Sequence, residues 1–222
     1  MLLVPPPLFR SVVPLQTLTY IGRATDAGFN ISTTTKSFDF GAPSPNRHIL
    51  VMASFYVPTL SSCTVLGVAA PLIKSNYVGA GSKAAACLAT VPNGTVGNVV
   101  VTLSSGSTSG ISIDCWRIDK ATPPTLVDSE AVSVNTQNYS NSGIVVPADG
   151  GMVMALRSGY MGGARTFTWT GLTENSDAAV AANANASAAS AKFTSGQNPL
   201  NIGVNCSGSI SEAVAFTAVC LQ

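Results

Sequence analysis

Short runs of alternating apolar and polar residues dominate this chain, and each run is bounded by Gly, Pro, Asn or Ser. Such alternation is typical of half-buried β-strands, and no window sustains the 3.6-residue apolar period of a capped amphipathic helix. We therefore expect an all-β protein, an antiparallel β-sandwich or a jelly-roll-like fold. The expected strands cover residues 18–22, 35–40, 48–57, 63–68, 82–90, 98–103, 111–118, 131–134, 143–146, 152–156, 166–170, 186–193, 200–206 and 213–221.

The alanine-rich stretch 178–191 is the one place where a helix competes with a strand. Asn183, Asn185 and several serines interrupt its apolar stripe, which weakens the helical pattern. We interpret it as a strand. Ala and Ser at alternate positions would suit a strand that packs closely against another surface.

The two halves of the chain resemble each other. Residues 63–90 align without a gap on residues 167–194, at a constant offset of 104 (167 − 63). The identical pairs are Thr64/Thr168, Gly67/Gly171, Ala84/Ala188, Ala85/Ala189 and Thr90/Thr194. A period of about 100 residues is too long for a solenoid rung and indicates a duplicated all-β unit. We expect an N-terminal strap at 1–17 and β-sandwich repeats at 18–121 and 122–222, touching across the short Pro-rich junction 121–125 as two units or as one domain.

Composition narrows the functional classes. Only 9% of residues are charged, against about a quarter in typical domains, and the net charge is +1. Lys and Arg are scattered singly, so neither nucleic acid nor an anionic membrane surface is an expected partner. The longest apolar stretch, 49–60, is too short for a spanning helix. An apolar, weakly charged surface with a mean hydropathy of +0.35 favours a subunit of a larger assembly.

The N-terminal strap carries an apolar sequence stiffened by three prolines. Polyproline II geometry would expose its apolar side chains along an extended segment, and the triple proline argues against a signal peptide. Either the strap is a disordered tail, or it is an anchor that docks into a groove of a partner. The candidate anchor residues are Leu2, Leu3, Val4, Pro5, Pro6, Pro7, Leu8 and Phe9.

The cysteines lie in apolar strand patterns without a Cys-X-X-Cys pair, and the chain has a single histidine. Metal sites need ligands at short spacing, so we expect no metal and no cofactor. Buried thiols acting as small hydrophobes are the favoured interpretation, and one or two disulfides are the alternative. The five candidates are Cys63, Cys87, Cys115, Cys206 and Cys220.

Catalytic groups are hard to assemble from this sequence. His48 follows a Pro-Asn-Arg turn, and we interpret it as a solvated turn residue. Asp114 lies in mid-strand, where Arg117 or Lys120 is the expected partner. We therefore expect no enzymatic activity. Carbohydrate binding stays open, because aromatic rings stack on sugars, although core packing is favoured for both tryptophans. The aromatic candidates are Trp116, Trp169, Tyr77, Tyr139 and Tyr160.

The second half carries a family resemblance. The run from Phe167 to Asp177 (FTWTGLTENSD), the alanine-rich strand after it, a Gly turn and the terminal strand 213–219 resemble β-sandwich virion structural proteins of tailed bacteriophages and prophages. The first half similarly pairs an apolar strand at 49–56 with a later strand at 111–118. The resemblance covers most of residues 18–222 and brings no catalytic residues.

The resemblance implies a structural role in the virion. The expected protein is a capsid decoration or spike, or a head–neck accessory protein, attached through residues 1–17. Its partners would be the major capsid, portal, collar or tail proteins, and further copies of itself, since trimers are common among such appendages. The alternative is a carbohydrate- or receptor-binding module of a tail fibre, for which a glycan would be the partner.

Overall fold

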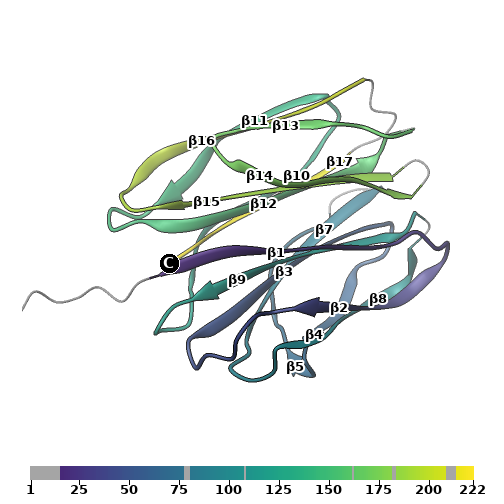
Figure 1. Ribbon diagram of the computed structural model, residues 1–222. Helices are drawn as coiled ribbons and strands as arrows, with labels where there is room; N and C mark the ends of the chain where they lie inside the picture. Colours follow the sequence, from purple (N-terminus) through teal and green to yellow (C-terminus); the bar gives the residue numbers. More distant parts are fainter. Residues whose placement is uncertain (1–15, 78–80, 108, 162, 182–183, 209–213) are drawn as a thin grey trace, which may run out of the picture.

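The protein is a stack of four antiparallel β-sheets (Figure 1). The computed structural model describes residues 16–77, 81–107, 109–161, 163–181, 184–208 and 214–222, and within these ranges the regular structure consists of seventeen strands and no helix. The all-β prediction is therefore confirmed, and the arrangement of the sheets is that of a β-sandwich. The strap residues Leu2 to Phe9 lie outside these described ranges.

Each half of the chain contributes one outer and one inner sheet. Outer sheet 1 consists of β2 (Ile31–Asp39), β8 (Val96–Ser107), β4 (Leu60–Val65) and β5 (Val68–Ala69), in that order. Inner sheet 1 consists of β1 (Thr17–Asp26), β9 (Ile111–Asp119), β3 (Arg47–Tyr56), β7 (Ser82–Thr90) and β6 (Leu72–Asn76). Inner sheet 2 consists of β10 (Leu126–Val134), β17 (Val214–Leu221), β12 (Gly151–Tyr160), β15 (Ala184–Phe193) and β14 (Thr173–Ala181). Outer sheet 2 consists of β11 (Asn138–Val146), β16 (Gln197–Cys206) and β13 (Phe167–Thr170).

Three apolar cores separate the four layers. One core lies between outer and inner sheet 1, and the corresponding core lies between inner and outer sheet 2. The third, the central core, joins the two inner sheets and contains residues of both halves, among them Met52, Trp116, Met154 and Val219. The inner sheets are therefore buried on both faces, so the two halves share one hydrophobic interior.

Burial on both faces explains the continuous apolar run of β3. Ile49 and Val51 point into the core shared with outer sheet 1, whereas Leu50 and Met52 point into the central core. A strand with only one buried face would instead alternate apolar and polar residues.

Alanine side chains line the contact between the two inner sheets. Ala84 and Ala86 of β7 and Ala186 and Ala188 of β15 are fully buried in the central core. The sheets pack with opposite strand order, β1 against β14 and β6 against β10. The predicted close packing is thus present, but the stretch 178–191 spans the end of β14 and most of β15 rather than a single strand.

The two halves have the same strand order. Position by position, β1, β9, β3, β7 and β6 correspond to β10, β17, β12, β15 and β14, and β2, β8 and β4 correspond to β11, β16 and β13. Both edge strands also shift register at the same place, between Leu72 and Lys74 in β6 and between Glu174 and Ser176 in β14.

The strand pairings disagree with the gap-free sequence alignment of the two halves. Strands β3 and β12 begin and end at an offset of 104 (151 − 47 and 160 − 56), which aligns Val51 with Ala155. The register partners of these two residues, Cys87 and Ala189, differ by only 102 (189 − 87). Ala84/Ala188, Ala85/Ala189 and Thr90/Thr194 are therefore not equivalent positions. The sequence analysis does not predict β6, and it covers only Val68 of β5 and the last four residues of β14. The reason is that β5 is only two residues long, whereas β6 and β14 are edge strands with many polar residues.

Both ends of the described chain lie at one end of the stack. The backbone oxygen of Gln16 accepts a hydrogen bond from Lys192, and Lys192 is in register with Met152, which pairs with Leu221. We call this the termini end. The opposite, distal end carries the ends of β3 and β12, since Tyr56 and Gly159 line one small cavity there.

Candidate functional site

A buried arginine closes the termini end of the first half. Arg47 is fully buried, and its Nε donates to the Val91 carbonyl at 2.7 Å, while its two terminal nitrogens donate to Gly41 at 3.0 Å and to Asn93 and Gly94 at 2.6 Å each. Burial lowers the pKa of Arg47, and the neighbouring Arg117 adds to that shift. All three nitrogens hold the loop before β3 and the loop between β7 and β8, so Arg47 is a structural clamp.

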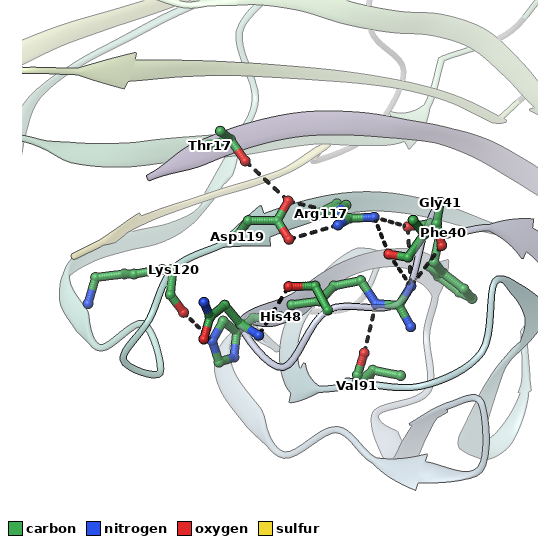
Figure 2. Close-up of polar contacts among 12 residues, drawn as sticks. Thr17, Phe40, Gly41, His48, Val91, Arg117, Asp119 and Lys120 are labelled. Carbon is green, nitrogen blue, oxygen red and sulfur yellow. Dashed lines mark hydrogen bonds and ion pairs between the residues drawn. The ribbon is translucent and has the colours of Figure 1, made fainter. Parts of the chain in front are cut away.

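Arg117 and Asp119 form a second, more exposed cluster beside it (Figure 2). The Arg117 Nε lies 2.7 Å from the Asp119 carboxylate, which also accepts a hydrogen bond from Thr17. Arg117 further donates to the Phe40 carbonyl at 2.8 Å. These hydrogen bonds lower the pKa of Asp119. The pair lines a hollow of about 570 Å³, but its charges are satisfied within the chain.

His48 is a buried strand residue, and the prediction of a solvated turn residue is wrong. Its Nδ1 lies 2.9 Å from the Thr90 hydroxyl and its Nε2 lies 3.1 Å from the Lys120 carbonyl (Figure 2). Burial lowers the pKa of His48. Both ring nitrogens are therefore engaged in holding β3 to its neighbours.

Asp114 lies in a polar network between the two halves. Its carboxylate is fully buried, and it accepts hydrogen bonds from Arg23 at 2.8 Å, from the Tyr20 hydroxyl at 2.8 Å and from the Ser176 hydroxyl at 3.0 Å. Neither Arg117 nor Lys120 is its partner, so that prediction is wrong. Strand alternation places Arg117 on the other face of β9, whereas Arg23 is the register partner of Asp114 on β1.

The aromatic rings are committed to packing. Trp116 is fully buried, 5.4 Å from the Tyr20 ring, and its indole nitrogen donates to Asn175 at 3.1 Å. Trp169 donates to Ser187 at 2.8 Å and faces the Phe216 ring. Tyr77 and Tyr139 also contact neighbouring rings, Tyr77 that of Phe55 and Tyr139 that of Phe216. The side chain of Tyr160 lies outside the described part. Trp116 is fully buried, and Tyr77, Tyr139 and Trp169 are half-buried with a neighbouring ring beside each, which favours packing over sugar stacking for the described candidates.

The outer face of outer sheet 2 carries a groove of about 410 Å³. Strand alternation places its side chains in cross-strand rows: Asn138 pairs with Asn205, which pairs with Thr168, and Ser140 pairs with Gly203, which pairs with Thr170. Among the described residues, the lining contains amides and hydroxyls and no charged group. It can exchange hydrogen bonds with a neutral polar ligand. The sequence signal is the alternation of Asn138, Ser140 and Ser142 along β11 together with Asn201 and Asn205 of β16, which the sequence analysis does not single out.

The five cysteines, Cys63, Cys87, Cys115, Cys206 and Cys220, are buried and free. Cys206 contacts the Met161 sulfur at 3.4 Å, while Cys63, Cys87 and Cys115 share the core between the sheets of the first half. Within the described ranges, no group of three or more His, Cys, Asp or Glu side chains is arranged to hold a metal ion. The same ranges contain no helix with the length and apolarity that crossing a membrane requires.

Comparisons with known proteins give no assignment. No family model, no curated protein and no solved structure matches this chain. Its function must therefore be argued from the fold and from its surfaces.

Proposed function

We propose that this chain is a structural accessory protein of a bacteriophage virion, attached through residues 1–17, with the four-layer stack as its projecting body. The observation that carries the proposal is that the two ends of the stack differ, since the chain enters the body at only one of them. The strap joins the body at the termini end, where Gln16 meets Lys192, so an anchored strap would present the distal end and both outer faces outward.

The body suits a passive structural role. Its three stacked cores bury both faces of the inner sheets, and the described arginines at the strand ends bind backbone carbonyls. Arg157, for example, is fully buried and donates at 2.7 Å to the carbonyls of Thr136 and Val204. These arginine side chains, which in an enzyme could bind a substrate, are here hydrogen-bonded to loop carbonyls, which supports a role that is not catalytic.

A duplication is part of the proposal. The shared strand order and the shared register shift in β6 and β14 support an origin of both halves from one β-sandwich unit. Further copies of the chain, as a trimer or another homo-oligomer, and the capsid, portal, collar or tail proteins are the proposed partners. Light scattering of the purified protein measures the first of these, and a monomer at micromolar concentration would contradict it.

Deletion of residues 2–9 tests the anchor. Purified full-length protein should bind to particles that lack it, and the deleted form should bind at least tenfold more weakly, as measured by co-sedimentation. Phe29→Ser is the matched control, because Phe29 is 77% exposed at the distal end and its loss should leave binding unchanged. Undiminished binding of the deleted form would contradict an anchoring role for residues 2–9.

Carbohydrate binding is a second candidate, and the groove on outer sheet 2 favours it. Its rows of amides and hydroxyls match the hydroxyl groups of a neutral sugar. The corresponding row of outer sheet 1 is Thr35, Val100 and Thr64, so an apolar residue there replaces Asn205. The two outer faces thus differ at the centre of the groove.

A glycan array followed by calorimetry tests this candidate. Asn138→Ala and Asn205→Ala should abolish the signal of any glycan that the wild type binds, because the two side chains are cross-strand neighbours in the groove. Asn98→Ala, on the outer face of outer sheet 1, should leave that signal intact. A flat array for the wild type, or equal loss in all three variants, would count against the groove.

A further inference from the structure

Three buried thiols meet in the core of the first half. Cys63 lies on β4 of outer sheet 1, and Cys87 and Cys115 lie on β7 and β9 of inner sheet 1. Cys87 and Cys115 flank Val51, their common register partner on β3. The thiol of Cys63 therefore faces two others across the interface between the sheets.

The backbone geometry excludes one pair and favours another. Two strand spacings of about 4.8 Å separate Cys87 from Cys115, which exceeds the limit of about 7 Å between the Cα atoms of a disulfide. Strands β4 and β7, by contrast, approach within 8 Å between Cα atoms, closer than the usual spacing of about 10 Å between packed sheets. Ala85 and Ala89 on the same face of β7 permit this approach.

The contact of the two sulfurs agrees with the backbone geometry. The neighbouring Cys63 thiol, together with burial, raises the pKa of the Cys87 thiol strongly, which places the two sulfurs close together in that core. Cys63 and Cys87 thus belong to facing sheets and are neighbours in one core of the reduced protein.

The second half shows how the same site is filled without sulfur. By strand order and register, the counterparts of Cys63, Cys87 and Cys115 are Phe167, Ala189 and Ala218, and all three are buried in the corresponding core. One large and two small side chains there occupy the place of three medium ones. Packing alone therefore does not require cysteine at these positions.

We propose that Cys63 and Cys87 form an oxidation site that closes an inter-sheet disulfide. The oxidant is a low-molecular-weight disulfide such as oxidised glutathione. The thiolate of one cysteine attacks it, releases one glutathione thiolate and forms a mixed disulfide. The second cysteine then displaces the other glutathione, so two protein thiols and one disulfide yield one protein disulfide and two glutathione thiols.

The cross-link would fasten the outer sheet of the first half to its inner sheet. It closes a loop over residues 63–87, which contains β5 and β6. Because both thiols are buried and the thiolate of Cys87 is disfavoured, exchange is slow in the folded protein and proceeds while the chain folds. An intracellular chain would stay reduced, whereas a particle refolding or opening in an oxidising medium would be locked.

Oxidative refolding of the full-length protein tests the site. The protein is refolded from urea with oxidised glutathione or with a reductant, its free thiols are counted, and its disulfides are mapped by mass spectrometry without reduction. The oxidised form should retain three thiols (5 − 2) of the five, yield a peptide linking Cys63 to Cys87, and melt roughly 5–15 °C higher.

Variants keep the test decisive. Cys115→Ala should still form the cross-link, as should Cys220→Ala in the second half. The triple variant Cys63→Phe, Cys87→Ala, Cys115→Ala adopts the residues of the second half, so it should fold and show the same melting temperature in oxidant and reductant. Five free thiols in folded protein after oxidative refolding, or a link from Cys63 to Cys115, would overturn the proposal.

Discussion

Asp114→Asn is the sharpest probe of the contact between the two halves. The substitution keeps the shape of the side chain and one carbonyl oxygen, but it removes the charge that faces Arg23. Arg23 has a side chain only 7% exposed, so its guanidinium cannot turn to water without opening the seam between β1 and β14.

The expected cost follows from burial. Removing one partner of a buried ion pair destabilises a protein by about 3–5 kcal/mol, because the remaining charge stays unpaired. For a chain of this length, each kcal/mol corresponds to about 2–4 °C of melting temperature, so a loss of roughly 6–20 °C is expected. The double variant Arg23→Met, Asp114→Asn should recover at least about 2 kcal/mol of the sum of the single losses, since no charge is then left buried.

Urea unfolding of the single and double variants, followed by tryptophan fluorescence and circular dichroism, measures these energies. Asp119→Asn is the matched control, because Asp119 lies on the same strand in an ion pair whose side chains are 18% and 26% exposed. Its loss should cost no more than about 1 kcal/mol. Equal effects of the two Asp→Asn substitutions would refute the assignment of Asp114 to a buried inter-half network.

Three further predictions concern packing and protonation. Burial lowers the pKa of His48 below 6.5, so its contribution to stability is complete above pH 6.5 and decreases as the pH falls toward the folded pKa, with a slope of at most ~1.4 kcal/mol per pH unit. His48→Gln should flatten the pH dependence of the free energy of unfolding in urea between pH 7.5 and 5.5. Identical slopes for the wild type and the variant would contradict the burial of the ring. Ala186→Leu should cost about 1–3 kcal/mol in the same assay, because Ala186 is fully buried in the central core and a larger side chain would overpack it. The exposed Ala179→Leu should stay within about 0.5 kcal/mol, and similar losses in both variants would argue against close contact of the inner sheets. Gly67 and Gly171 both have positive φ, but an added Cβ at Gly171 would lie 2.1 Å from the Asn201 oxygen and at Gly67 would meet nothing within 4 Å. Gly67→Ala should therefore cost about 1–2 kcal/mol of stability and Gly171→Ala clearly more. A larger loss for Gly67→Ala in scanning calorimetry would contradict this order.

Strand positions were predictable where one face is buried and the pattern alternates. The apolar run of β3 and the alanines of β7 and β15 also carried the signal of the central core, since continuous apolar or small residues are what a strand buried on both faces requires. The edge strands β6 and β14 were not predictable in the same way, because their polar side chains resemble loop sequences.

Pairings across the fold were the least accessible from sequence. The sequence predicts a partner for Asp114 among its neighbours in sequence, yet its partner Arg23 is 91 residues away (114 − 23) and becomes adjacent only when β1 pairs with β9. His48 reads as a turn residue after Pro45, and only the pairing of β3 with both β7 and β9 buries its ring. The groove depends likewise on the register of β11, β16 and β13, which sequence alternation alone does not set.

The most direct test of the proposed function is the location of the protein on particles. Particles are purified by density gradient from a lysate of cells that carry the gene, and a gold-labelled antibody against the four-layer body is followed in the electron microscope. Regular labelling at one site of the particle, lost when residues 2–9 are deleted, is the result that the account predicts. Protein that stays at the top of the gradient while the particles are intact would contradict it.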